Sequence, residues 1–149
     1  MAYKGLYCPK NPEKYKGDPN NIKYLSLWER NIMKTFDESK MILSWFAPSG
    51  SFEFFIPYTS PKDGKIHRYL PDFLAKVKQK DGSIAKFLIE VKPKIQTEPP
   101  KLPKSKRKSK RYFAALHTYA INQAKWAAAR DWCEQNGYIF QVMTEIICT

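Results

Sequence analysis

The sequence predicts an α/β protein of the α+β type, a single domain in which helices flank one central, mixed, four-stranded sheet. A chain of 149 residues, 43% of them hydrophobic, can bury roughly two thirds of its unfolded surface around one core. Segments rich in strand-forming residues occupy its middle and its end, and two segments carry apolar residues at helical spacing. Their order is helix, three strands, helix, strand, which fits helices packed against a single sheet.

The beginning of the chain differs in composition from the rest. Residues 1–25 are rich in Lys, Asn, Pro and Tyr without apolar periodicity, so we expect an irregular arm that needs the body, residues 26–149, to be ordered. Ser26 is placed to cap a helix, with Glu29 three positions later as in a capping box. Apolar residues then recur every four positions, which predicts a helix over residues 27–39.

Four segments are expected to form the sheet. They are rich in aromatic, β-branched and other apolar residues and are bounded by turn residues: 52–58, 67–78, 83–92 and 138–143. A short apolar stretch over 41–48 precedes them and is not counted among the strands. The second and third strands are separated by a loop containing Asp81 and Gly82, a pair typical of tight hairpins, so these two strands should be antiparallel.

A basic, proline-rich segment separates the predicted hairpin from the last helix. Residues 101–111 contain seven of the 26 Lys and Arg residues and no acid, so the other 138 residues carry only 19 − 14 = +5. Four prolines between positions 93 and 103 interrupt regular structure, so residues 93–111 are predicted to be a solvated tether that becomes helical towards its end. The longest helix is predicted over 108–135, ending before an Asn-Gly pair.

Composition limits the classes of partner. A body of modest positive charge with one concentrated basic segment suits a polyanion, either nucleic acid or an anionic membrane surface. The longest apolar runs are far shorter than the roughly 20 residues that cross a bilayer. The first ten residues lack the pattern of a signal peptide, so a cytoplasmic location is expected. The two histidines and three cysteines have no partners at zinc-ligand spacing, so a zinc site is not expected.

The hairpin strands carry the most informative residues. If the loop has three residues and ends with Gly82 in the left-handed conformation, Asp72 on the first strand lies opposite Glu90 on the second. Side chains alternate along a strand, so Lys92 then shares the face of Glu90. A two-residue loop would instead pair Asp72 with Val91 and turn Glu90 to the other face.

Two carboxylates and an ammonium group at one place suit phosphodiester hydrolysis. Adjacent carboxylates repel unless a cation lies between them, and hard oxygen ligands suit Mg²⁺ or Mn²⁺. Such an ion polarises a phosphoryl oxygen and lowers the pKa of a bound water. Lys92 would orient that water or offset charge on phosphorus. The alternative is that these charged residues occur near one another by chance, since 27% of the residues are charged. For Glu29, metal binding and helix capping both stay open.

At these residues the sequence resembles the PD-(D/E)xK nuclease superfamily, with Asp72, Glu90 and Lys92 as the signature and Glu29 as the early helical acid. A more specific likeness, to the head completion nucleases of T-even-like tailed bacteriophages, covers nearly the whole chain. It rests on these motifs: Pro9-Lys10-Asn11, Lys14-Tyr15-x-Gly17-Asp18-Pro19-x-x-Ile22-x-Tyr24-x-Ser26-x-Trp28-Glu29, Ile89-Glu90-Val91-Lys92-Pro93-Lys94, Pro99-Pro100, Thr118-Tyr119, Lys125-Trp126 and Thr144-Glu145.

The resemblance implies a restriction-endonuclease-like core and a Mg²⁺-dependent deoxyribonuclease, with Mn²⁺ as a second possible ion, that acts on packaged phage DNA before the tail joins the head. By the same resemblance, Asp72, Glu90 and the Val91 carbonyl hold the metal, Lys92 is the catalytic lysine and Glu29 is an auxiliary acid. The implied partners are DNA and the phage portal, neck or head components, and no membrane. The implied locations are the host cytoplasm during assembly and the head–tail junction of the virion.

The remaining candidates concern DNA contact. The basic segment is either a clamp on the DNA backbone or a plain solvated loop, and the aromatic residues after it either stack on unpaired bases or pack in the core. The residues predicted to contact DNA are Lys94, Lys104, Lys106, Arg107, Lys108, Lys110, Arg111, Gln123 and Lys125. The alternative from another class is a non-catalytic head-completion protein that binds DNA or the portal, in which the acids form structural ion pairs.

Overall fold

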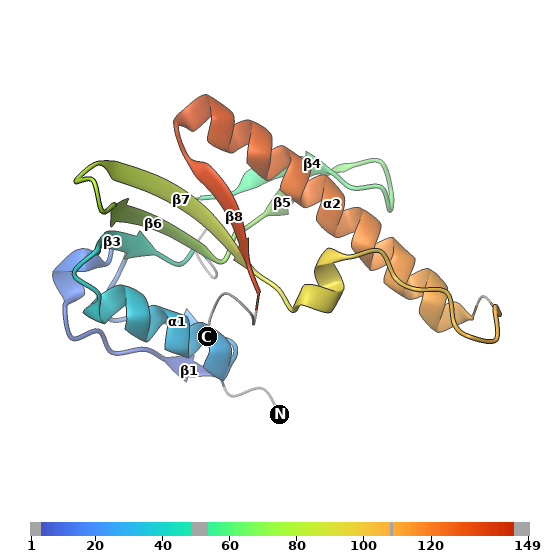
Figure 1. Cartoon of the computed structure of the whole chain (residues 1–149), viewed down its shortest axis with the longest axis horizontal. Coiled ribbons are helices and arrows are strands. Elements are labelled where there is room, and N and C mark those ends of the chain that lie inside the picture. Colours follow the sequence, from blue (N-terminus) through green and yellow to red (C-terminus); the bar gives the residue numbers. More distant parts are fainter. Residues whose placement is uncertain (1–3, 49–53, 108, 145–149) are drawn as a thin grey trace.

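The computed structural model describes residues 4–48, 54–107 and 109–144 and has the predicted α+β architecture (Figure 1). Its elements in chain order are β1 (Gly5–Leu6), the 3₁₀ turn η1 (Pro12–Lys14), β2 (Lys23–Tyr24), α1 (Leu27–Glu38), β3 (Ile42–Phe46), β4 (Ile56–Thr59), β5 (Ile66–Tyr69), β6 (Phe73–Lys78), β7 (Ile84–Val91), the 3₁₀ turn η2 (Lys94–Thr97), α2 (Lys110–Asn136) and β8 (Ile139–Met143). None of the described helices combines the length and apolarity needed to cross a membrane.

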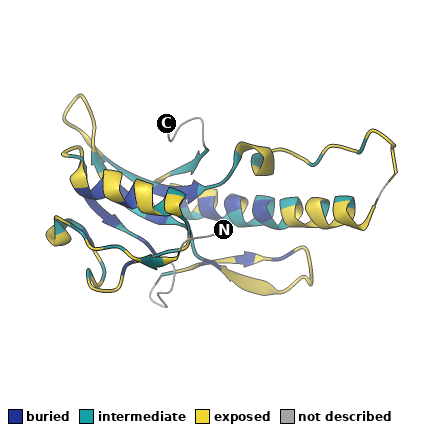
Figure 2. Ribbon diagram, turned by 90° about the horizontal axis from the view of Figure 1, so that it is seen from below, coloured by how far each residue is buried: buried dark blue, intermediate teal, exposed yellow. Residues whose placement is uncertain are grey.

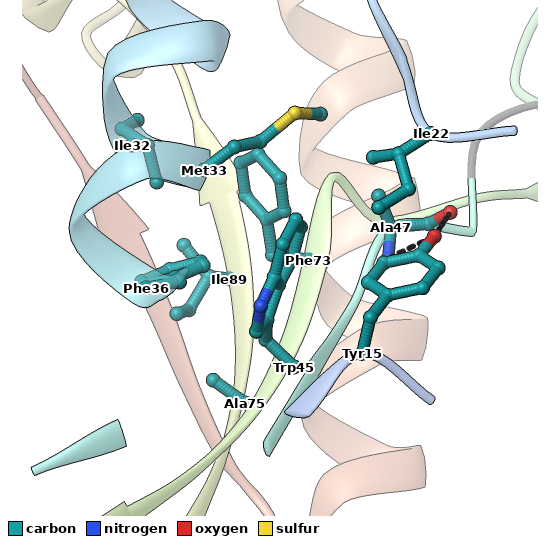
Figure 3. Packing of buried hydrophobic residues seen from close by; sticks show 10 residues of the cluster. All are labelled: Tyr15, Ile22, Ile32, Met33, Phe36, Trp45, Ala47, Phe73, Ala75 and Ile89. Atoms are coloured by element: carbon teal, nitrogen blue, oxygen red, sulfur yellow. Dashed lines mark hydrogen bonds between the residues drawn. The ribbon is translucent and has the colours of Figure 1, made fainter. Parts of the chain in front are cut away.

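A mixed sheet in the order β3-β6-β7-β8 forms the centre of the domain. Strand β8 is parallel to β7, and the other pairs are antiparallel. One apolar cluster lies on the α1 side of the sheet, where Trp45 and Phe73 pack between α1 and Tyr15 of the arm (Figure 3). A second cluster on the α2 side contains Leu88 of β7 and Trp126 of α2. The alternation of side chains along β6 and β7 therefore supplies both cores.

The hairpin between β6 and β7 has the predicted register. Gly82 has φ +87°, and the Gln79 and Ser83 residues on either side of the three-residue loop are joined by a 2.8 Å hydrogen bond from the Gln79 amide to the Ser83 carbonyl. Phe73 is paired with Ile89. The three-residue loop is therefore the one that forms, and the two-residue alternative is excluded.

The composition of the sheet differs from the prediction. The stretch at 41–48, not counted as a strand, contains β3, which pairs with β6 at the sheet edge. The predicted strand at 67–78 is two strands, β5 and β6, in different sheets, because Pro71 between them has no amide hydrogen for a ladder. The predicted strand at 52–58 begins at Ile56 within the described residues and pairs with β5, outside the main sheet.

Both helices lie within two residues of their predicted bounds. The Ser26 hydroxyl accepts a hydrogen bond from the Glu29 amide at 3.1 Å, which caps α1 as expected. Helix α2 ends at Gly137, whose φ of +74° is the left-handed conformation that terminates helices. Figure 2 shows that the buried positions of α2 lie in its C-terminal part, while its first turns extend past the sheet.

The arm, of which residues 4–25 are described, is hydrogen-bonded to the C-terminal end of α1. Asp37, which has no exposed surface, accepts hydrogen bonds from the Tyr7 hydroxyl and from the amides of Lys10 and Asn11 at 2.7–2.9 Å. The Lys14 ammonium donates to three carbonyl groups at the end of α1, those of Phe36, Asp37 and Ser39, at 2.7–2.8 Å. Cations are favourable at this end of a helix. The motifs that contain Lys10-Asn11 and Lys14-Tyr15 thus have a structural role.

Replacing Lys14 by Met should destabilise the fold by about 1–2 kcal/mol, because three helix-terminal carbonyls lose a charged donor. The free energy of unfolding in urea measures this. The control is Lys16→Met, since the exposed Lys16 side chain makes no hydrogen bond within the described structure. Equal stability of the two variants would contradict the capping role.

Candidate active site

The predicted acids meet where the hairpin strands end, at the edge opposite the loop. Asp72 directly precedes β6, and Glu90 is the second-last residue of β7. The Val91 amide donates a 2.7 Å hydrogen bond to the Asp72 carboxylate, which holds this side chain against the second strand. Asp72 and Glu90 therefore lie side by side, as the register predicted.

Glu90 is held from two sides. Its side chain is buried, with 6% of the residue surface exposed, and one carboxylate oxygen accepts a 2.5 Å hydrogen bond from the Tyr69 hydroxyl. The other oxygen lies 3.8 Å from the Lys92 ammonium. Tyr69 was not among the site residues predicted from the sequence, and it comes from the separate β4–β5 sheet. Its only signal was its position three residues before Asp72.

The two carboxylates are difficult to ionise together. Burial raises the pKa of Asp72 above its usual value, although the Val91 amide and the charges of Lys92 and Lys125 oppose the shift. Burial, followed by the charge of Asp72, raises the pKa of Glu90 to about 7, against the opposing effects of Tyr69 and both lysines. The geometry thus concentrates negative charge that a cation would stabilise.

Glu29 lies close to this pair at the first turn of α1. Burial and then the charge of Asp72 raise the pKa of Glu29. The Ser26 hydroxyl lies 3.4 Å from its carboxylate, so a contact with the capping residue is present. The same carboxylate is near enough to Lys92 for the lysine to lower its pKa. The capping contact does not remove Glu29 from the site, and its role towards a metal stays a prediction.

The predicted DNA-contacting residues separate into two groups. Lys125 on α2 lies near enough to the acids for its charge to lower the pKa of both Asp72 and Glu90. Its ammonium group is 5.8 Å from the centre of the Tyr58 ring. Gln123, two positions earlier, faces another side of the helix. Lys94 is exposed in η2, two residues beyond Lys92.

The basic segment is not brought to the carboxylates. Its described members are exposed on the loop after η2 and at the start of α2: Lys104, Lys106, Arg107, Lys110 and Arg111. Lys108 lies outside the described residues. Lys110 precedes Lys125 by fifteen residues, which is about 22 Å along a helix axis. The aromatic residues after the basic segment were predicted either to stack on bases or to pack in the core. Phe113 and His117 are exposed, so core packing is wrong for these two.

The donor set fits a hard divalent cation. Within residues 4–48, 54–107 and 109–144 there is no cluster of three or more His, Cys, Asp or Glu side chains arranged to hold a metal. Mg²⁺ keeps several waters and takes only one or two carboxylates, so Asp72 and Glu90 suffice for it chemically. The Val91 carbonyl, next along β7, stays a predicted third donor.

Comparison with known proteins gives two matches. Residues 48–145 match the model of the family described as "TnsA-like endonuclease N terminal". The chain is also 38% identical, over 147 residues, to a protein of Enterobacteria phage T4 named "Head completion nuclease". That alignment covers 97% of this chain and 93% of the phage T4 protein. The family match contains Asp72, Glu90 and Lys92, whereas Glu29 precedes it.

Glu90→Gln should stabilise the metal-free protein at high pH. The pKa of Glu90 is above its ordinary value in the folded state, so the unfolded state loses the proton first and stability falls as pH rises from about 4.5 through about 7. Gln has no proton to lose, so the variant should be more stable by about 1–3 kcal/mol at pH 8 and should gain little at pH 4. Urea unfolding across pH in EDTA measures the difference. Glu134→Gln, at an exposed position of α2, is the control, and an identical pH slope in all three proteins would contradict the assignment.

Proposed function

The chain belongs to the TnsA-like endonuclease family, and on that premise we propose that it is a metal-dependent deoxyribonuclease acting in phage head completion. One observation carries the metal dependence. Two carboxylates, the buried Glu90 and the half-buried Asp72, lie together with raised pKa values although two lysines are near. This arrangement is unfavourable by itself and becomes favourable when a divalent cation is bound.

The residues around the acids have distinct tasks in hydrolysis. Bound Mg²⁺ or Mn²⁺ supplies Lewis-acid polarisation of the phosphoryl oxygen and a more acidic water. Tyr69 and the Val91 amide fix the two carboxylates by hydrogen bonds, so that they need no reorganisation during the reaction. Lys92 orients the attacking water and offsets charge at phosphorus. Lys125 approaches from α2 and neutralises a phosphate of the cleaved strand.

The non-catalytic alternative requires the acids to be structural ion pairs. Such pairs lower the pKa of a carboxyl group, because the neighbouring cation favours its charged form. Here Lys92, 3.8 Å from Glu90, and Lys125 do lower the pKa values of both acids, but burial outweighs the two lysines and the pKa values stay raised. These observations favour catalysis over a purely structural role.

The phage relative supports a proposal for where the protein acts. Identity of 38% across nearly the full length of both chains supports the same role, completion of the filled head. On this proposal the protein acts on packaged DNA, contacts portal, neck or head components, works in the host cytoplasm during assembly and can stay at the head–tail junction.

Asp72→Asn and Glu90→Gln should each lower Mg²⁺-dependent cleavage of DNA by at least about a hundredfold, since each removes a ligand charge without changing side-chain shape. Incubation of linear and circular DNA with and without Mg²⁺ measures this. Glu134→Gln should cleave like the parent. Full turnover in either active-site variant, or cleavage in EDTA, would refute metal-dependent catalysis at this site.

Neutralising the basic segment should weaken DNA binding without altering the chemical step. The six substituted residues are Lys104, Lys106, Arg107, Lys108, Lys110 and Arg111. Each lost phosphate contact should flatten the slope of log affinity against log salt by about 0.9 on duplex DNA. Turnover at saturating DNA should stay near that of the parent while the half-saturating concentration rises.

The control for this experiment keeps the basic segment and removes the same net charge elsewhere. It neutralises six exposed lysines: Lys34, Lys40, Lys62, Lys65, Lys78 and Lys80. If DNA binding depends on contacts of the basic segment with phosphates, the control should keep the parent's slope of log affinity against log salt. An unchanged slope in the segment variant would make the segment a plain solvated loop.

A further inference from the structure

A groove lies between the segment that follows β7 and the first half of α2. It has a volume of about 840 Å³, and its walls come from residues 94–101 on one side and 114–122 on the other. Figure 1 shows this segment running beside the protruding half of α2 before it turns back into the helix. The groove is large enough for a ligand of small-molecule size and too small for a duplex.

Both walls of the groove lead to the active site. On the loop side, Lys94 lines the groove and is two residues from Lys92. On the helix side, Thr118 and Asn122 line it, and Lys125 follows at the same spacing of three to four residues, on the same face of α2. Lys92 and Lys125 both lie near the carboxylates, so each wall of the groove begins within two or three residues of the active site.

The lining of the groove combines apolar, aromatic and basic groups. Ile95 is 79% exposed and lies there with Pro99, while Ala115 leaves space on the helix and Tyr119 supplies an aromatic ring. Lys94 and Lys101 are the basic lining residues and Glu98 is the acidic one, so the lining has a net charge of +1. Unpaired nucleotides match this chemistry, because bases stack on aromatic and apolar side chains while phosphates attract lysines. A blunt duplex keeps its bases stacked inside and offers no such surface.

We propose that the groove binds the unpaired strand of a DNA substrate next to the cleaved phosphate, so that the preferred substrate class is DNA with a single-stranded tail or branch. This proposal rests on the nuclease function proposed above. It assigns the strand a path from the carboxylates, between Lys94 and Asn122, towards Tyr119 and Lys101.

The test fills the groove with a side chain. Ala115→Phe places a ring in it, and the matched control Ala120→Phe places the same ring at an exposed position of α2 that does not line the groove. Affinity is measured by fluorescence anisotropy in EDTA, which prevents metal-dependent cleavage, with a tailed duplex and a blunt duplex of equal length. The parent and the control should bind the tailed DNA at least about tenfold more tightly, and Ala115→Phe should lose this preference.

A second variant covers a failure of Ala115→Phe to fold. Tyr119→Leu keeps apolar bulk and removes the stacking ring, so it should also reduce the preference for tailed DNA. Equal affinity of the parent for both DNAs, or an equal preference in the groove variants and the control, would overturn the proposal and leave the groove to a protein partner. Cleavage of the same DNAs in Mg²⁺ tests the nuclease function separately, because binding in EDTA does not depend on it.

Discussion

The hydrogen bond from the Val91 amide to the Asp72 carboxylate joins the two hairpin strands where the acidic residues meet. It can form only in the register set by the three-residue loop, in which Gly82 adopts φ +87°. A slip of one residue would turn Glu90 to the other face of the sheet and separate the acids. A turn at one end of the hairpin therefore determines whether the site exists at the other end.

The fold has to stabilise this unfavourable arrangement from outside the hairpin. The Tyr69 hydroxyl satisfies Glu90 from β5, and burial of both acids raises their pKa values. Helix α1 brings Glu29 to the site at one end and is held by Lys14 of the arm at the other. Because α1 is a rigid element packed on Trp45 and Phe73, the arm helps to position the acid that stands beside Asp72.

Local signals made part of this structure predictable. The Asp-Gly loop, the capping residue Ser26 and the terminating Gly137 act on their immediate neighbours, so the register and both helices followed from the sequence. Strand β3, Tyr69 and the contacts of Lys14 depend on residues distant in the chain, and no short pattern encodes them. Pro71 did signal a break between β5 and β6, but the strand propensity on either side concealed it.

Helix α2 connects three features that the sequence presents separately. Lys125 lies at the carboxylates, the groove follows from Asn122 back to Ala114, and the basic segment begins before Lys110. These features succeed one another along about 22 Å of one continuous helix. A strand that leaves the active site through the groove would therefore meet the basic residues at a fixed distance from the cut. The half of α2 that extends past the sheet gains little from the core, so the proposed contact with DNA gives a physical reason for its length.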